Sequence, residues 1–188
     1  MATVMGIGLG KLGAFVAAFI GVVAVAAWLS AMARISFVRV DTEIAIDAPP
    51  ETVWAVVSDF SRYPEWNPLM VKVSGRPREG ERMEWTSVID HVARDYNAAI
   101  DRAVPNRELA WTGPVSSAAR ALFWGHHQLL IEQQSGGSVR FVNTEGFGGL
   151  ATLVIRGFLL NQVRTAYEAH NAALKARAEA TVTARSTP

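Results

Sequence analysis

The sequence predicts an α+β domain made of an antiparallel sheet and one long C-terminal helix. Residues 44–68, IAIDAPPETVWAVVSDFSRYPEWNP, run from a strand into a helix that begins at a proline. Through the middle of the chain, short apolar runs alternate with Gly, Pro and Asn, which indicates successive hairpins and therefore antiparallel pairing. Near the C-terminus, apolar residues recur at three- and four-residue steps, which is typical of an amphipathic helix.

The opening of the domain is the most specific part of this pattern. Residues 35–47 alternate apolar and polar positions as in a half-buried strand. Pro49 and Pro50 end that strand at positions where proline is well placed to open a helix, which we expect over residues 50–60. A second, short and irregular helix or turn should follow over residues 61–68.

The rest of the domain should consist of strands and then the long helix. The apolar runs predict strands near residues 70–74, 82–88, 97–103, 108–111, 121–133 and 138–147. The helical period holds from about Leu153 to Ala178. The folded domain is therefore expected over residues 35–180, and the small polar residues 181–188 are expected to form a disordered tail.

An apolar segment precedes the domain. Residues 12–33 form an uncharged stretch of 22 residues between Lys11 and Arg34. A helix of that length spans roughly 33 Å, about the thickness of the hydrocarbon core of a bilayer. The stretch predicts a transmembrane helix within an N-terminal membrane anchor over residues 1–34. The alternatives are a cleaved signal peptide that ends near Ala33 and a helix buried in the core.

The expected localisation is that of a single-pass membrane protein. Lys11 stands on one side of the apolar stretch and Arg34 and Arg39 on the other, so the basic residues leave open on which side the domain lies. The spacing of Gly6 and Gly10 would allow two such helices to approach closely, which leaves a weak homodimer possible.

Charge, cysteine content and motifs exclude several classes of function. The 18 basic and 17 acidic residues of the 188-residue chain nearly cancel, so we expect no nucleic-acid partner. Cysteine is absent, which excludes disulfides and thiolate metal sites. Gly8, Gly10 and Gly13 have the spacing of a dinucleotide motif, but no strand precedes them and no acidic residue follows at the required distance. We therefore expect neither a cofactor nor a metal.

The strongest candidate for a chemical site is a pair of residues on one predicted hairpin. A three-residue loop at residues 135–137 would pair residues whose numbers sum to 272, so His127 would face Glu145. His126 would project to the opposite face, so the two adjacent histidines could not hold one metal. His127 and Glu145 could serve as a general acid and base, or they could form a structural pair within the sheet.

The same register predicts an apolar surface around this pair. Leu129 would face Asn143, and Ile131 would face Phe141. These residues then share one mostly apolar face with His127 and Glu145 at its end, and that face is the candidate inner side of the sheet.

Residues 44–68 resemble the opening of the START-like, or SRPBCC, superfamily, which includes polyketide cyclase/dehydrase-like proteins and lipid-transfer domains. The strand, the helix ending in Asp59–Phe60 and the turn Tyr63–Pro64–Glu65–Trp66 come in the same order. His127 and the run from Glu145 to Gly149 also match positions that are common in polyketide-cyclase-like sequences. The resemblance covers about residues 38–180. It implies a helix-grip fold, in which a curved sheet grips the long helix and two short helices follow the first strand.

The resemblance also implies a hydrophobic ligand, lipid-like or polyketide-like, between the sheet and the long helix. Aromatic and apolar side chains are candidates for lining the pocket, although most aromatic residues in a small domain belong to its core. His170 lies on the apolar stripe of the long helix and is expected to be a satisfied core histidine. The expected ligand-binding residues are Trp54, Trp66, Trp85, Leu129, Ile131, Phe141, Asn143, Phe147, Val163 and Tyr167.

Three functions are compatible with these observations. The expected one is a membrane-anchored binding or carrier protein for the hydrophobic ligand. The first alternative is a polyketide cyclase/dehydratase-like enzyme that uses His127 and Glu145 to move protons. The second is an interaction module with a filled core, which the absence of a cavity of roughly 300–1,000 Å³ would favour.

Overall fold

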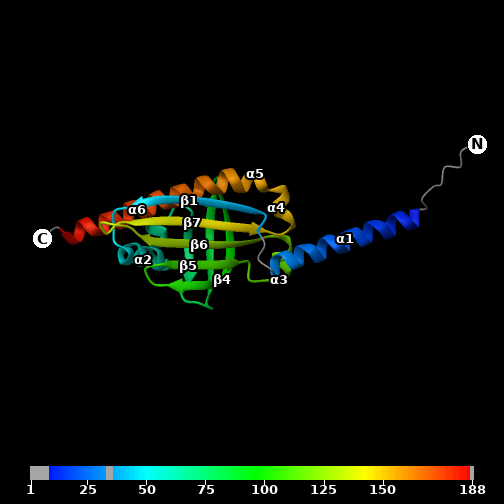
Figure 1. The fold of residues 1–188 in the computed structure, drawn as a ribbon, viewed down its shortest axis with the longest axis horizontal. Coiled ribbons are helices and arrows are strands. Elements are labelled where there is room, and N and C mark those ends of the chain that lie inside the picture. Colours follow the sequence, from blue (N-terminus) through cyan, green and yellow to red (C-terminus); the bar gives the residue numbers. More distant parts are fainter. Residues whose placement is uncertain (1–8, 33–35, 187–188) are drawn as a thin grey trace, which may run out of the picture.

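A seven-stranded antiparallel sheet curves around the long C-terminal helix (Figure 1). The computed structural model describes residues 9–32 and 36–186. The strands lie in the order β1-β7-β6-β5-β4-β3-β2. Their bounds are β1 Val38–Ile46, β2 Met70–Gly75, β3 Arg82–Ile89, β4 Val92–Val104, β5 Glu108–Gly113, β6 Trp124–Gln133 and β7 Val139–Gly148. The predicted α+β helix-grip architecture is confirmed.

The first strand and the two short helices form as the sequence predicts. Side chains of β1 alternate between buried and exposed positions, as expected for a strand with one face toward the core. Helix α2, Pro50–Ser58, begins at the proline, which lacks only an N–H that the first turn would leave free. The 3₁₀ helix η1, Phe60–Glu65, follows, and the hydroxyl of Tyr63 donates to the Val57 carbonyl at 2.7 Å. This bond joins η1 to the end of α2.

One predicted strand begins later than expected. Residues 117–122 form helix α3, Ser117–Leu122, and β6 begins only at Trp124. The hydroxyl of Ser116 accepts a hydrogen bond from the Ala119 amide, which caps the helix, and alanine has the highest helix propensity. The prediction of strand from residue 121 was therefore wrong.

The long helix is interrupted in its first part. Residues 150–163 form α4 Leu150–Val154, α5 Arg156–Phe158 and a π-helical turn η2 Leu159–Val163. The continuous helix α6 begins at Arg164. The β-branched pair Val154 and Ile155 and the glycine at 157 weaken a regular helix, because β-branched residues and glycine have low helix propensity. Amphipathic spacing alone did not reveal this break.

Helix α6 also ends later than predicted. It runs to Ser186, so residues 181–186 are helical rather than a disordered tail, and residues 187 and 188 lie outside the described residues. Val182 packs against the core, and the hydroxyl of Thr181 donates to the Arg177 carbonyl at 2.9 Å. These contacts and the alanines of this segment explain why the helix continues.

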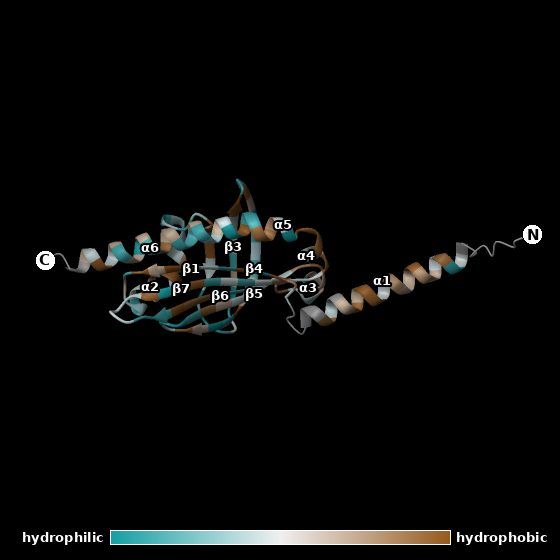
Figure 2. Cartoon of the chain, turned by 45° about the horizontal axis from the view of Figure 1, so that its top comes forward, coloured by the Kyte–Doolittle hydropathy of each residue, from teal (hydrophilic) through white to brown (hydrophobic). Residues whose placement is uncertain are grey.

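Helix α1, Leu9–Met32, covers most of the predicted apolar stretch and runs outward from the end of the domain where it contacts α3 (Figure 1). Apolar residues occupy much of its surface (Figure 2). Over the part of the chain that the structure describes, no helix has the length and apolar character needed to cross a bilayer, so the predicted transmembrane helix is not supported. Ala33 and Arg34 lie outside the described residues. A membrane location and pairing through this segment stay predictions.

The core lies between α6 and the face of the sheet that α6 covers, here called the inner face. Leu174 and Ala178 of α6 are fully buried, and so are Val40 of β1 and Phe141 of β7. Burying a leucine side chain in this way contributes about 1.5–3 kcal/mol to stability. Polar and apolar residues alternate along α6 (Figure 2), consistent with one buried and one exposed side.

Candidate functional site

His127 and Glu145 face each other on the inner face, as the sequence predicts. Strands β6 and β7 are joined by a three-residue loop, and the Gln134 amide donates to the Ser138 carbonyl at 2.9 Å where the loop closes. The His127 Nδ1 atom lies 3.1 Å from Oε2 of Glu145, and the two side chains are only 7% and 12% exposed. The predicted hairpin register therefore places an imidazole and a carboxylate in direct contact inside the protein.

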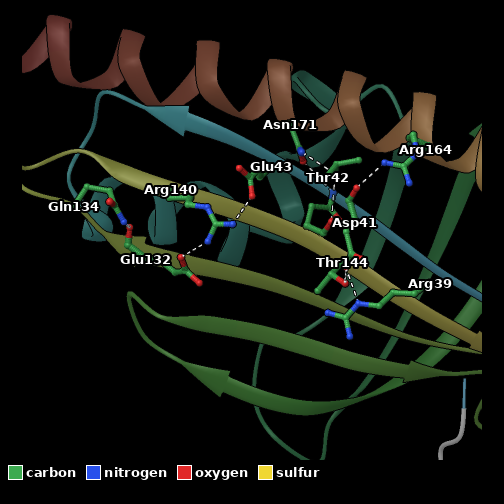
Figure 3. A network of polar contacts seen from close by, with 11 residues as sticks. Arg39, Asp41, Thr42, Glu43, Glu132, Gln134, Arg140, Thr144, Arg164 and Asn171 are labelled. Carbon is green, nitrogen blue, oxygen red and sulfur yellow. Dashed lines mark hydrogen bonds and ion pairs between the residues drawn. The ribbon is translucent and has the colours of Figure 1, made fainter.

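A chain of hydrogen bonds behind His127 determines which of its nitrogens carries a proton. The single hydroxyl proton of Thr42 is donated to the Asn143 carbonyl at 3.2 Å, so the same oxygen accepts from Nδ2 of Asn171 at 3.0 Å (Figure 3 shows Thr42 and Asn171). Oδ1 of Asn171 then accepts from Nδ2 of Asn143 at 3.0 Å. This fixes the orientation of the Asn143 amide, whose Oδ1 lies 2.7 Å from Nε2 of His127. An amide oxygen only accepts, so Nε2 is protonated.

The protonation of Nε2 has a direct consequence for the contact with Glu145. The other ring nitrogen, Nδ1, is therefore the atom that can take up or release a proton beside the carboxylate. With a proton on Nδ1 the ring is an imidazolium beside the carboxylate, and without that proton it is a neutral imidazole. The 3.1 Å contact of Nδ1 with Oε2 is therefore an ion pair when His127 carries a proton at Nδ1, and an imidazole beside a carboxylate is the equipment of a general acid and base.

Tyr167 of α6 completes this group from the opposite side. Its hydroxyl donates to the Glu145 carboxylate. Burial and the negative charge of Glu145 raise the pKa of Tyr167 well above its usual value, so the phenol stays protonated and remains a donor. The Glu145 carboxylate thus contacts His127 from the sheet and accepts a hydrogen bond from Tyr167 of the long helix.

A glycine on β6 makes room for the carboxylate. Gly125 lies two residues before His127 and so on the same face of the strand. A Cβ atom at this position would overlap Oε1 of Glu145. Any larger residue would displace the carboxylate from its place beside His127 and Tyr167, so the absent side chain is part of the site.

Aromatic rings form a row on the inner face that ends at this group. The ring centroids of Tyr96 and Trp85 are 5.5 Å apart, and those of Trp85 and Trp111 are 6.3 Å apart. Trp111 lies 4.5 Å from His127, which lies 4.8 Å from Tyr167. The row crosses four strands and reaches α6, and it offers π-faces on which a flat, apolar molecule could stack.

A second group of rings lies one helical turn further along α6, around His170. The turn motif of the sequence supplies Tyr63 and Trp66, whose rings are 5.0 Å apart. Trp66 lies 5.4 Å from the ring of His170, and Phe141 of β7 lies 6.4 Å from it on the sheet. The expectation of a satisfied core histidine was wrong, because within the described part of the chain both ring nitrogens of His170 are buried and lack a hydrogen-bond partner.

His126 lies on the outer face, as predicted. Its Nδ1 atom lies 2.9 Å from the Thr112 hydroxyl and 3.2 Å from the Asp101 carboxylate. Further ion pairs join strands on the outer face, where Arg140 contacts both Glu43 and Glu132 (Figure 3). The residues that the structure describes include no cluster of His, Asp and Glu suited to a metal ion.

Two of the surface hollows of the described residues have volumes above about 300 Å³. One of about 560 Å³ lies between α2, η1 and the C-terminal half of α6, and Trp66 and Arg177 are among its lining residues. The other, of about 340 Å³, lies over β2, β3 and β4, and its lining includes Lys72 and Asp95 as well as Trp85 and Tyr96 of the ring row. Neither is lined by His127 or Glu145, so this pair lies in the interior and not at the base of either hollow.

The predicted ligand-binding residues fall into two groups in the structure. The first group is buried between sheet and helix, whereas the second is half-buried and packs against the edge of the core. The buried residues are Leu129, Ile131, Phe141, Asn143, Phe147, Val163 and Tyr167, and the half-buried ones are Trp54, Trp66 and Trp85.

The polyketide cyclase/dehydrase and lipid transport family has a sequence model that matches residues 38–179 of this chain. The chain belongs to this family. The match runs from the first residue of β1 almost to the end of α6, and so contains every residue of the site. The resemblance to the START-like superfamily that residues 44–68 predicted is confirmed. No curated protein matches the sequence.

Solved structures share the fold of this family member at low sequence identity. The Zhui aromatase/cyclase of a Streptomyces species is 18% identical with a TM-score of 0.67, and the alignment covers 79% of this chain and 97% of that one. A START superfamily protein of Mycobacterium smegmatis is 19% identical with a TM-score of 0.59, covering 76% and 98%. A Thermus thermophilus protein is 17% identical with a TM-score of 0.62, covering 76% and 98%. At these identities the likeness shows the fold alone.

Several residues of the site in this polyketide cyclase/dehydrase family member were not predicted. Thr42 and Asn171 come from β1 and α6, and their contact with Asn143 depends on how the helix docks on the sheet. Tyr96 and Trp111 were missed as members of the ring row because the predicted pairing extended only over β6 and β7. A signal was available for Asn171, since it is a polar residue directly beside the apolar stripe of the long helix.

Proposed function

We propose that this protein binds a hydrophobic small molecule, lipid-like or polyketide-like, between the inner face of the sheet and α6. The observation that carries the proposal is the buried group of Tyr167, Glu145 and His127, which lies among apolar and aromatic side chains. The family to which the chain belongs is described by polyketide cyclase/dehydrase activity and lipid transport, which supports the same class of ligand.

Binding in this interior would combine apolar contact with a small number of polar contacts. Each Å² of apolar ligand surface removed from water contributes about 25 cal/mol, so burial provides affinity. The hydrogen-bonding groups provide orientation, because an oxygen of the ligand placed beside Glu145 or Tyr167 would replace a hydrogen bond that the protein now makes with itself.

The ligand would enter by parting α6 from the sheet. The His127 and Glu145 side chains are nearly closed to solvent, and neither of the two surface hollows is lined by them. The interrupted segment before α6, with its short helices and its π-helical turn, supplies a place where the helix could bend. Uptake then selects a more open conformation that the ligand stabilises.

A second candidate function is proton transfer on the bound molecule, in the manner of a cyclase or dehydratase. The direct contact between the His127 imidazole and the Glu145 carboxylate favours it. In a dehydration, the basic member of the pair would take a proton from a carbon next to a ketone, and the acid form would give a proton to the departing hydroxyl, so that water leaves and a double bond remains. The carrier is the simpler function, because it needs only binding.

Uptake of a fluorescent fatty acid by the full chain tests the proposal. Leu129→Trp enlarges a buried side chain on the inner face and should abolish uptake, while the far-UV circular dichroism stays native. Leu130→Trp is the matched control. Leu130 follows Leu129 on the same strand but points to the outer face, so this change should leave uptake unaltered. Equal uptake by the two variants would favour an interaction module with a filled core. The absence of uptake in the wild type and in both variants would favour the same alternative.

A further inference from the structure

His170 differs from the other polar side chains that α6 turns toward the sheet. Tyr167 donates to Glu145, and Asn171 bonds to both Asn143 and Thr42. His170 is 2% exposed, yet among the described residues neither of its ring nitrogens has a hydrogen-bond partner. Of the three buried polar side chains of α6, the protein itself satisfies Tyr167 and Asn171 but not His170.

An unpartnered imidazole at this position is costly for the fold. Leaving a buried donor or acceptor without a hydrogen bond costs about 1–3 kcal/mol, whereas an apolar side chain of similar size would avoid the cost. The surrounding rings of Trp66 and Phe141 supply apolar contact but no hydrogen-bonding atom suited to both nitrogens. Buried polar groups that lack a protein partner are candidates for contact with a bound molecule.

The surroundings of His170 also determine the protonation state in which it would contact a bound molecule. Burial, and secondarily the nearby His127, lower the pKa of His170 to about 3, so the ring is neutral at physiological pH. A neutral imidazole offers one N–H donor and one acceptor nitrogen. It can therefore donate to a ketone or accept from a hydroxyl, and it does not offer the positive charge that a carboxylate requires.

His170 lies beside Tyr167 on α6 and so borders the group that contains His127 and Glu145. Tyr167 and His170 are three residues apart on α6, so their side chains neighbour each other on one face of the helix. A molecule whose rings lie along the row that ends at His127 and Tyr167 would extend toward Trp66, with an oxygen substituent at His170.

We propose that His170 hydrogen-bonds a neutral hydroxyl or ketone oxygen of the ligand, and thereby selects oxygenated ring compounds over plain hydrocarbons and over carboxylates. This proposal rests on the proposed function, since it names the chemical class that the interior site prefers. The preference expected from one net hydrogen bond is about 3–10-fold in affinity.

The test compares three probes on the full chain: 2-naphthol, 2-methylnaphthalene, which has nearly the same shape, and the larger anion 2-naphthoate. Wild-type protein should bind 2-naphthol about 3–10-fold more tightly than 2-methylnaphthalene and should bind 2-naphthoate more weakly than 2-naphthol. His170→Phe should bind 2-naphthol and 2-methylnaphthalene equally, and His170→Gln should keep part of the preference because it keeps a donor and an acceptor. His126→Phe replaces a histidine on the outer face and should behave as wild type.

A second readout follows the histidine itself. In a ¹⁵N–¹H spectrum of the imidazoles, the ¹⁵N resonances of His170 should move much further with 2-naphthol than with 2-methylnaphthalene, because both probes exert a similar ring current and only 2-naphthol forms the hydrogen bond. If the wild type binds both probes but His170→Phe keeps the full preference for 2-naphthol, the role of His170 is refuted while the proposed binding function stands. If the wild type binds none of the three probes in its interior, the binding function itself is refuted, and the selection by His170 with it.

Discussion

Nδ1 of His127 lies 3.1 Å from the Glu145 carboxylate in a protein interior where Nε2 of the same ring is already protonated. A chain of hydrogen bonds from the Asn143 backbone carbonyl through Thr42 and Asn171 to the Asn143 side chain determines which nitrogen of that ring carries the proton. The contact therefore places the one ring nitrogen that can gain or lose a proton directly beside a carboxylate, and several expected outcomes depend on it.

Removal of either member of the pair should affect catalysis if the protein is a cyclase or dehydratase. His127→Ala and Glu145→Gln should each lower turnover of a poly-β-ketone by about 10²–10⁴, the usual contribution of a positioned acid or base. The double variant should lose little more than either single one, because the two groups act as a unit. Turnover at the wild-type rate in either single variant would leave the pair with a structural role, and His126→Ala serves as the control on the outer face.

Gly125→Ala should destabilise the fold through Glu145. Alanine is normally better than glycine in a strand by roughly 0.5–1 kcal/mol, but here the added Cβ overlaps the carboxylate. We expect a net loss of about 1–3 kcal/mol in the free energy of unfolding, measured by urea denaturation. In the background of Glu145→Ala the same change should cost nothing. Additive effects of the two substitutions would show that the glycine is not there for the carboxylate.

His170 should make the fold sensitive to acid. Its pKa falls from 6.5 in the unfolded chain to about 3 in the folded protein, so protonation favours the unfolded state. The stability that neutral His170 allows is fully present above pH 6.5 and is lost as the pH falls toward 3, by up to about 1.4 kcal/mol per pH unit. Carboxylates also titrate in this range, so the measurement is the difference in unfolding free energy between wild type and His170→Phe. A difference that stays constant from pH 7 to pH 4 would contradict the burial of a neutral imidazole.

Thr42→Val should weaken the hydrogen bonds that orient His127. The valine keeps the shape of threonine but leaves Nδ2 of Asn171 without its acceptor, which costs about 1–3 kcal/mol. Thr86→Val is the control, because the Thr86 hydroxyl bonds Asp95 at an exposed position and its loss should cost well under 1 kcal/mol. Equal losses of stability in the two variants would show that the buried chain does not act as described.

The parts of the fold that follow from local rules could be predicted from the sequence. The proline at residue 50 gave the start of α2, and a three-residue loop with two glycines gave the register that places His127 opposite Glu145. A hairpin register depends on the loop alone, so both partners were determined before the fold was known. Alternation in β1 likewise identified the side chains that face the core.

Features that depend on how α6 docks on the sheet could not be predicted in this way. The periodic stripe placed Tyr167 and His170 on the inner side of the helix but could not say that one would bond Glu145 and the other would find no partner. The break before Arg164 and the helical start at Ser117 were missed because apolar spacing takes no account of capping by Ser116 or of the glycine at 157.

Native mass spectrometry of the full chain after gentle purification tests the central claim most directly, because it looks for the bound molecule itself. We predict that wild-type protein and Leu130→Trp carry an additional noncovalent mass of a small organic molecule, and that Leu129→Trp, whose added ring fills the space at the inner face, does not. Wild-type protein without such a mass after exposure to lipid and polyketide extracts, or the same mass on Leu129→Trp, would contradict binding between the sheet and α6.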